Sequence, residues 1–149
     1  MQTTELTTDQ KGAIAETAII HAAVKLGVGV FKPLSDGERY DLIFDLRPRL
    51  VRVQCKWAPL QGDVVTVRLY SNRRTANGLL RRCYSSGEID ALAAYCPHLD
   101  RCFYLPGDRV IGHQQLVLRV APSLNNQKRG INWASEFGFE RLQSLLPGP

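Results

Sequence analysis

The chain has 149 residues, a formal net charge of +5 at pH 7 and a sequence pI near 9.2. This length suits one well-buried core and is too short for two comfortable domains, so we expect one domain over residues 1–149. The positive excess favours a polyanionic partner over a membrane surface. The alternative is that so modest a charge only aids solubility.

The sequence contains no sign of a membrane segment or an export signal. No stretch approaches the roughly 18 consecutive apolar residues that a membrane span needs, and the N-terminus lacks a signal-peptide pattern. We therefore expect an intracellular protein that does not bind membranes. Its cysteines include no Cys-x-x-Cys pair, which leaves Cys96, His98 and Cys102 as only a weak zinc candidate. In a reducing compartment, buried apolar cysteines are expected rather than disulfides.

The first predicted element is a helix over residues 7–26, opened by a Thr-x-x-Gln capping box and ended by glycine. Glu16 has small and apolar helical neighbours, so this acid either lies at the edge of the buried face or points at a cation. A short strand at 28–31 follows. Its Pro, Gly and charged residues then predict a loop at 32–39.

The next segment carries an unusual set of polar residues. Residues 39–46 and 50–57 are rich in β-branched and aromatic side chains and flank an Arg-Pro-Arg break, which predicts a hairpin. Asp41, Gln54 and Lys56 lie within these two strands. Charged groups are rarely buried unless they are paired or bind a metal, so their convergence here predicts a functional site.

The register of this hairpin decides whether the polar groups can meet. Directly opposed residues share a face, so Asp41 meets Gln54 and Lys56 only if paired residue numbers have an odd sum. A three-residue loop at 47–49 would instead place Asp41 opposite Cys55. We therefore predict either a four-residue turn or a β-bulge near Asp41.

Two more polar residues lie on the predicted hairpin. Asp45 shares the face of Asp41 by parity, but its place beside the turn indicates a solvated strand-end acid. Arg52 shares the face of Gln54 and Lys56, and it either contacts a phosphate or reaches solvent.

An arginine-rich segment follows a turn at 58–63 and a β-branched strand at 64–70. Residues 71–82 show no periodicity and predict a mobile loop. Such a loop is either a solvated surface or a contact for nucleic acid phosphates, and its place beside the predicted site favours DNA. The candidate DNA-binding residues are Arg73, Arg74, Arg81 and Arg82.

Two apolar runs at 89–96 and 101–105 predict further strands of the sheet. Asp90 in the first of them is expected to have a structural role rather than a catalytic one. A short helical turn is expected at 107–113 and a strand at 114–121.

The C-terminal part contains a polar basic segment and then an aromatic one. Amide side chains can read adenine edges in the major groove, and basic side chains read guanine or phosphate. The candidates here are Asn125, Asn126, Gln127, Lys128 and Arg129. Aromatic and leucine residues over 131–146 have mixed helical spacing and predict core or oligomer contacts.

Four blocks of the chain together resemble a known nuclease family. Asp41 followed by Gln54, Cys55 and Lys56 resembles the PD-(D/E)-x-K core, in the variant of group I intron-associated homing endonucleases where Gln replaces the second acid. Tyr40 stands where the family often has proline. The other blocks are Lys-Gly-x-x-Ala-Glu at 11–16, the acidic and apolar run at 88–95, and Asn-Asn-Gln with Ile-x-Trp-Ala at 125–134.

The resemblance implies an α/β (α+β) fold of the restriction-endonuclease-like type, in which an N-terminal helix precedes a central mixed β-sheet with flanking helices. It also implies hydrolysis of DNA phosphodiester bonds with Mg²⁺, or with Mn²⁺ in its place. A protein with this activity would work in the bacterial cytoplasm, at the nucleoid.

The resemblance also implies a role for each residue of the predicted site. Asp41 and Glu16 would bind Mg²⁺ through carboxylates, Gln54 through its amide oxygen and Cys55 through its backbone carbonyl. Because Gln54 replaces an acid, metal affinity should be weaker and Glu16 more important. Lys56 would orient or deprotonate the attacking water, or stabilise the transition state.

Site-specific cutting of both strands needs two active sites, so a chain with one site should form a homo-oligomer, a dimer or a tetramer. One alternative keeps the fold and changes the substrate, as in a Holliday-junction resolvase or a repair nuclease. The other alternative is a non-catalytic DNA-binding module, which the Gln54 replacement makes conceivable.

Overall fold

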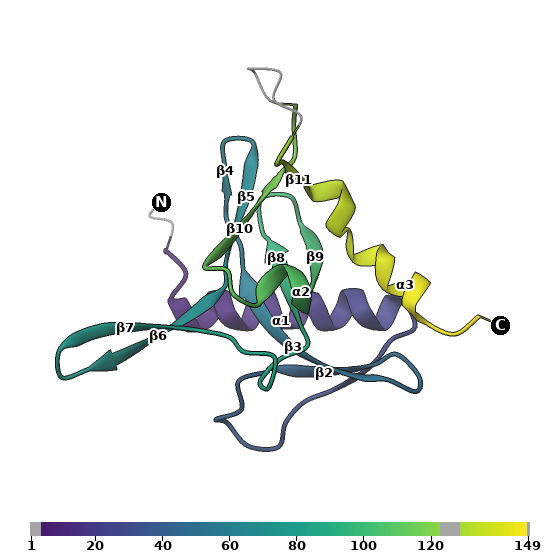
Figure 1. Ribbon diagram of the computed structural model, residues 1–149, viewed down its shortest axis with the longest axis horizontal. Coiled ribbons are helices and arrows are strands. Elements are labelled where there is room, and N and C mark those ends of the chain that lie inside the picture. The colour runs from purple at the N-terminus through teal and green to yellow at the C-terminus, as the bar shows by residue number, and fades with distance from the viewer. Residues whose placement is uncertain (1–3, 123–128, 149) are drawn as a thin grey trace.

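The computed structural model describes residues 4–122 and 129–148, and a five-stranded sheet lies at its centre (Figure 1). The helices are α1 (Thr8–Lys25), α2 (Gly107–Val110) and α3 (Leu142–Leu145), with the 3-10 helices η1 (Ala134–Phe137) and η2 (Phe139–Arg141). The strands are β1 (Gly29–Phe31), β2 (Leu42–Asp45), β3 (Leu50–Trp57), β4 (Leu60–Gln61), β5 (Val64–Arg68), β6 (Tyr70–Thr75), β7 (Gly78–Cys83), β8 (Ala91–Cys96), β9 (Arg101–Pro106), β10 (Gln115–Arg119) and β11 (Asn132–Trp133).

The five-stranded sheet has the order β1-β2-β3-β8-β9. Neighbouring strands are antiparallel except for β3 and β8, which run parallel. A parallel pair needs a long crossover connection, and here the chain between the two strands forms β4 to β7. The predicted central mixed sheet is confirmed, as are the strands predicted at 89–96 and 101–105.

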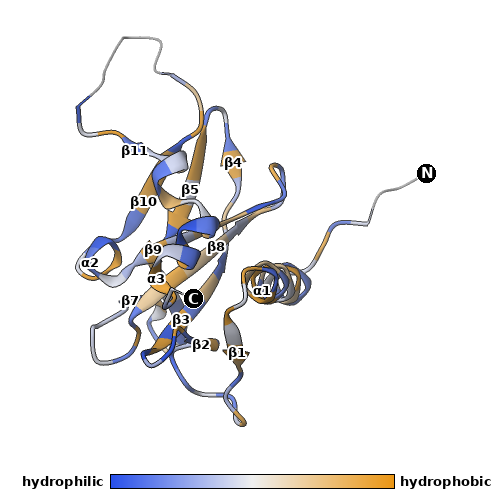
Figure 2. Ribbon diagram, turned by 90° about the vertical axis from the view of Figure 1, so that its right-hand side faces the viewer, coloured by the Kyte–Doolittle hydropathy of each residue, from blue (hydrophilic) through white to orange (hydrophobic). Residues whose placement is uncertain are grey.

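Helix α1 covers one face of this sheet, and Figure 2 shows it end-on beside the strands. Thr7 and Gln10 form the predicted capping box, in which each side chain accepts a hydrogen bond from the backbone N–H of the other residue. Ala15, Ile19 and Ala23 recur every four residues and are buried on the inner side of the helix. Glu16, the acid of the predicted site, is half-buried at the edge of that inner side.

A second, four-stranded sheet in the order β11-β10-β5-β4 packs over the opposite face. Val67 and Leu118 of this sheet share one buried core with Leu92 and Phe103 of the first. Strands β4 and β11 were not predicted, because elements of two residues each are too short to show a period of two. Because apolar cores cover both faces of the central sheet, a polar side chain on this sheet is unusual.

The prediction of a mobile loop over residues 71–82 is wrong. Strands β6 and β7 form a hairpin that extends away from the body of the protein (Figure 1). Thr75 pairs with Gly78 across the turn, and Gly78 has a φ of +111°, which favours glycine. Every residue over 72–83 is exposed, so the segment lacks the apolar alternation by which a half-buried strand is recognised.

The aromatic C-terminal segment packs into the cores as predicted. Phe137 joins the core between the two sheets, and Phe139 and Leu142 join the core under α1. The expectation of buried cysteines holds for Cys96 and fails for Cys83, which lies exposed on the hairpin. Within the described ranges, no helix is both long and apolar enough to cross a membrane.

Candidate active site

The hairpin of β2 and β3 has the predicted four-residue turn. Asp45 pairs with Leu50, so residues 46–49 form the connection and paired residue numbers have an odd sum. The paired residues of this ladder end at Leu42 and Val53, and Asp41 directly precedes the first residue of β2. The Asp41 side chain meets β3 at the backbone of Cys55, which stands between Gln54 and Lys56 in the chain.

Asp41 is held at the start of β2 by contacts to β3. Its backbone N–H donates to Val53 O at 2.9 Å, and its carboxylate accepts a hydrogen bond from Cys55 N at 2.9 Å. Burial raises the pKa of the Asp41 carboxyl, and the Cys55 N–H opposes this shift. The carboxylate of Glu16 lies close enough to raise the pKa of Asp41 further. Helix α1 and the hairpin thus bring two acids together.

A lysine that the sequence analysis did not identify also belongs to this cluster. Lys32 follows β1 and forms an ion pair with Glu16, and that hydrogen bond raises the pKa of Lys32. Asp41 contributes to the same shift. Because Phe31 pairs with Ile43, Lys32 arrives beside the start of β2. Only this pairing register, which the sequence did not reveal, would have identified it.

Gln54 and Cys55 present amide and carbonyl groups next to Asp41. Gln54 Nε2 lies 3.5 Å from the Cys55 backbone carbonyl oxygen, so the two groups are adjacent. Burial, with the nearby Asp41, raises the pKa of the Cys55 thiol well above its ordinary value. The thiol is therefore neutral, and the backbone carbonyl is the polar group that Cys55 offers.

Lys56 extends from β3 toward the base of the hairpin β6–β7. Its Nζ donates to Tyr70 O at 2.8 Å and lies 5.3 Å from the centre of the Tyr84 ring. Burial lowers the pKa of Lys56 to about 8, and Asp41 opposes this shift. The positive charge of Arg39 lowers this pKa as well. Arg39, which lies in the loop before β2, was also missed.

Comparison with known proteins identifies the family. A family model described as PD-(D/E)XK endonuclease matches residues 6–140. This chain belongs to the PD-(D/E)XK endonuclease family. The solved structure of a bacterial homing endonuclease, I-Ssp6803I, is also similar, with a TM-score of 0.72, 26% sequence identity and 89% of each chain covered. Among curated proteins, no sequence matches this chain.

These matches confirm the predicted family and fold and support a DNA endonuclease. Nucleases of the PD-(D/E)XK family generally use divalent metal ions. The site suits such an ion chemically, since two carboxylates, an amide and a carbonyl offer the hard oxygen donors that Mg²⁺ prefers. Burial is the main cause of the raised pKa of Asp41, and the negative charge of Glu16 adds to it. A cation between the two carboxylates would offset this repulsion. Within the described residues, no group of three or more His, Cys, Asp or Glu side chains forms a metal cluster.

The sequence suggested that Arg52 contacts a phosphate or reaches solvent, whereas in the structure it forms an ion pair with Asp90. Its Nε and NH2 donate to the two carboxylate oxygens of Asp90 at 3.0 and 2.9 Å, and its backbone N–H donates to the same carboxylate. It also donates to the carbonyls of Gly87 and Ser86. The guanidinium therefore ties β3 to the segment that leads into β8. The structural role predicted for Asp90 fits this geometry.

The first predicted group of DNA-binding residues, four arginines, lies on the hairpin β6–β7. Arg73 and Arg74 lie near its tip and are exposed. Arg81 stacks on Tyr70 at 4.4 Å, and Arg82 forms an ion pair with Glu88 at 2.9 Å. Of the second predicted group, Arg129 is exposed, whereas the remaining members lie outside the described residues. These members are Asn125, Asn126, Gln127 and Lys128.

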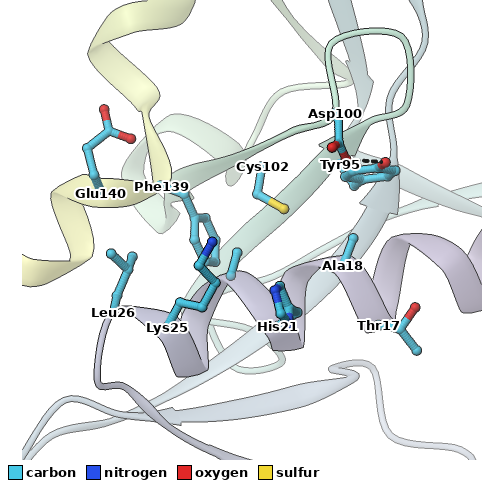
Figure 3. A pocket seen from close by; sticks show the side chains of 11 residues that line it. Thr17, Ala18, His21, Lys25, Leu26, Tyr95, Asp100, Cys102, Phe139 and Glu140 are labelled. Carbon is cyan, nitrogen blue, oxygen red and sulfur yellow. Dashed lines mark hydrogen bonds between the residues drawn. The ribbon is translucent and has the colours of Figure 1, made fainter.

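A pocket of about 570 Å³ lies away from this polar cluster, between α1 and the β8–β9 hairpin (Figure 3). Figure 3 shows His21 and Lys25 on the helix side and Asp100 and Glu140 on the other sides. The pocket carries charges of both signs. It is lined by none of the residues predicted to be catalytic.

Proposed function

We propose that this PD-(D/E)XK nuclease is a metal-dependent, site-specific endonuclease of the homing type that cuts both strands of duplex DNA. The observation that carries the proposal is the contact of Asp41 with β3, where its carboxylate accepts from the Cys55 N–H between Gln54 and Lys56. The similarity to a bacterial homing endonuclease over 89% of both chains supports the same interpretation.

The proposed metal ligands are the carboxylates of Asp41 and Glu16, the amide oxygen of Gln54 and the carbonyl oxygen of Cys55. The ion is Mg²⁺, with Mn²⁺ as a substitute. When bound, it would neutralise charge on the phosphate and lower the pKa of water. The protein would hold these donors through β3, which is paired on both edges, and through the Cys55 N–H that orients Asp41.

Lys56 is proposed to act on the attacking water or on the charge that develops at the phosphate. Its Nζ is held by a backbone carbonyl rather than by a carboxylate, so a substrate can displace that interaction without breaking an ion pair. Lys56→Arg separates the two roles. Retained cleavage would identify a cation that stabilises charge, and lost cleavage would identify a proton acceptor.

The hairpin β6–β7 is proposed as the main DNA contact. A two-stranded ribbon fits the major groove of B-form DNA, and four arginines on this one supply contacts to phosphates or guanines. The segment with Asn125, Asn126, Gln127, Lys128 and Arg129 stays a second candidate. Exposed Leu79 and Leu80 near the turn offer apolar contact to thymine methyl groups.

Cutting both strands requires two copies of the site, so we propose a homo-oligomer, either a dimer or a tetramer. Sedimentation equilibrium of the purified protein, with and without duplex, tests this directly. A monomer in both conditions would contradict the proposal.

The deciding experiment incubates the protein with a randomised duplex library in Mg²⁺ or Mn²⁺ and sequences the new ends. Lys56→Ala serves as the inactive variant, and Lys25→Ala, which changes an exposed lysine of α1, serves as the matched control. Ends clustered at one long motif with wild type and Lys25→Ala, and absent with Lys56→Ala, support the proposal. Scattered ends would indicate a repair-type nuclease, and binding without any new ends would indicate a non-catalytic module.

A further inference from the structure

Arg39 joins the hairpin β6–β7 to the segment that leads into the active site. Its side chain is only 19% exposed, although arginine is usually exposed. Its NH1 donates to Ser71 Oγ of β6, and its NH2 donates to the carbonyls of Arg82 and Cys83 of β7 at 3.3 and 3.2 Å. A single guanidinium thus holds both strands of the hairpin at their base.

Two further contacts fix Arg39 in this position. Its Nε lies 3.1 Å from Glu88 Oε2, and its Cζ lies 4.3 Å from the centre of the Tyr84 ring. Burial raises the pKa of Glu88. Hydrogen bonds from Ser85 and the positive charges of Arg39 and Arg82 lower this pKa by more. The carboxylate therefore stays charged and also binds Arg82 at 2.9 Å.

The same base of the hairpin contacts Lys56. The carbonyl that accepts from Lys56 Nζ at 2.8 Å belongs to Tyr70, the first residue of β6. Tyr84, which directly follows β7, lies under both Lys56 and Arg39. Arg39 and Lys56 consequently bind one structural unit, and the position of that unit determines where the Lys56 ammonium points.

We propose that Arg39 is a positioning residue that holds the base of the hairpin, and with it the Tyr70 carbonyl, where that carbonyl orients Lys56 Nζ toward the catalytic face. The inference rests on the proposed function, because it assigns Lys56 to the chemical step. It links DNA contact on the hairpin to the catalytic lysine through one guanidinium. A lysine at position 39 cannot fully replace this guanidinium, because an ammonium lacks the planar arrangement of donors that reaches Ser71 and two carbonyls together.

The first readout separates DNA binding from the cleavage step. Arg39→Ala, Arg39→Lys and a control, Arg101→Ala, are compared for duplex Kd and for single-turnover rate at saturating DNA. Arg101 also stacks on an aromatic ring, at 5.0 Å from Phe103, but lies on β9. We expect Arg39→Ala to lower the saturated rate by about 10- to 100-fold, because a small misplacement of a catalytic group has that effect. Kd should change much less, Arg39→Lys should recover part of the rate, and Arg101→Ala should match wild type.

The second readout needs no catalytic activity. Acetic anhydride is added to DNA-free protein over a series of pH values, and mass spectrometry gives for each lysine the limiting acylation rate of its neutral amine. This limiting rate does not depend on the rise in the Lys56 pKa that follows loss of the Arg39 charge. In Arg39→Ala, Lys56 should react several-fold faster than in wild type, because its Nζ no longer donates to the Tyr70 carbonyl. Exposed Lys25 should react at the wild-type rate, which controls for the reagent, and the far-UV circular dichroism of the same sample reports that the variant is folded. If the acylation rate of Lys25 also changes in Arg39→Ala, the acylation rate of Lys56 and the saturated cleavage rate are measured in Arg39→Lys instead.

A faster Lys56 reaction together with a lower saturated rate supports the positioning role. Wild-type values for both readouts would overturn it while leaving the proposed function intact. If wild type cleaves no DNA but Lys56 still reacts faster in Arg39→Ala, the link between the hairpin and Lys56 stands and the proposed function fails. A change confined to Kd would also overturn the inference, because Arg39 would then serve only to hold the hairpin against DNA.

Discussion

The proposed catalytic cluster, whose Gln54 and Lys56 lie on β3, and the hairpin β6–β7 are neighbours that are built in opposite ways. The cluster lies on β3, which has a paired strand on each edge and an apolar core on each face. The hairpin has one partner for each of its strands, and residues 72–83 are all exposed. The first arrangement holds side chains rigidly, and the second leaves a charged ribbon open to a large partner.

This contrast shows how one small fold can divide chemistry from recognition. Burial lowers the pKa of Lys56 to about 8 and raises the pKa of Asp41, so removal from water shifts both groups toward their neutral forms. Exposed arginines on the hairpin keep the full charge that phosphate contacts need. Changes in the two regions should therefore affect different measurable quantities.

The largest effect is expected at the cluster. Asp41→Asn should lower single-turnover cleavage by at least about 100-fold, because it removes a carboxylate from the proposed metal site while an Asn oxygen can still accept from Cys55. Asp63→Asn, an exposed acid in the turn before β5, is the matched control. Cleavage by Asp41→Asn at the wild-type rate would contradict the assignment of the site.

The next largest effect is expected for the scaffold under the cluster. Asp90→Asn should lower the free energy of unfolding at pH 7 by about 2 kcal/mol, because it breaks charge-assisted bonds to Arg52. The Arg52 hydrogen bond lowers the pKa of Asp90 in the folded state. The stabilisation is therefore present above an unfolded pKa of about 3.9 and is lost as pH falls through the lower folded value.

Urea unfolding of wild type and Asp90→Asn from pH 7 down to pH 3 measures this difference. The difference between the two proteins should shrink as pH falls below about 4. A difference that stays constant over this range would show that the ionised Asp90 carboxylate does not carry the stabilisation.

A smaller effect is expected on the hairpin. Replacing Arg73 and Arg74 together by Ala should weaken duplex binding by about tenfold and reduce the salt dependence of Kd by about one unit for each phosphate that no longer has an arginine beside it. Thermal stability should stay within about 0.5 kcal/mol, because these side chains are exposed. An unchanged salt dependence would exclude both residues from the DNA interface.

The smallest effect is expected at the edge of the cluster, where Lys32 binds Glu16. A divalent ion on Glu16 has to displace or tolerate this ammonium. Lys32→Met should therefore raise Mn²⁺ affinity several-fold, measured by the loss of the free Mn²⁺ signal in electron paramagnetic resonance. Lys25→Met is the control, and an unchanged or lower affinity for Lys32→Met would show that this lysine does not compete with the ion.

The part of the site that is close in sequence could be predicted. The motif within the predicted hairpin indicated Asp41, Gln54 and Lys56 as candidates, and an acid on an apolar helix face indicated Glu16. Lys32 could not be found, because its position depends on how β1 pairs with β2. The prediction for Arg52 was wrong for a similar reason, since its partner Asp90 is distant in sequence and only the parallel pairing of β3 with β8 brings the two together.

The fold shows the same division between local and long-range information. Capping residues defined α1, and apolar runs defined the strands of the central sheet. The hairpin β6–β7 was missed because no core marks one of its faces, and β4 and β11 were missed because each is two residues long. Strands that owe their existence to a partner rather than to a buried face leave no periodic pattern in the sequence.

The most direct test of the division between chemistry and recognition measures Kd and the saturated single-turnover rate on one cleavable duplex. It compares wild type, Asp41→Asn and the Arg73→Ala, Arg74→Ala double variant. We predict that Asp41→Asn loses the rate and keeps its affinity, whereas the double variant loses affinity. If both variants lose the rate and the affinity together, the cluster and the hairpin do not have separate functions, and the account is contradicted.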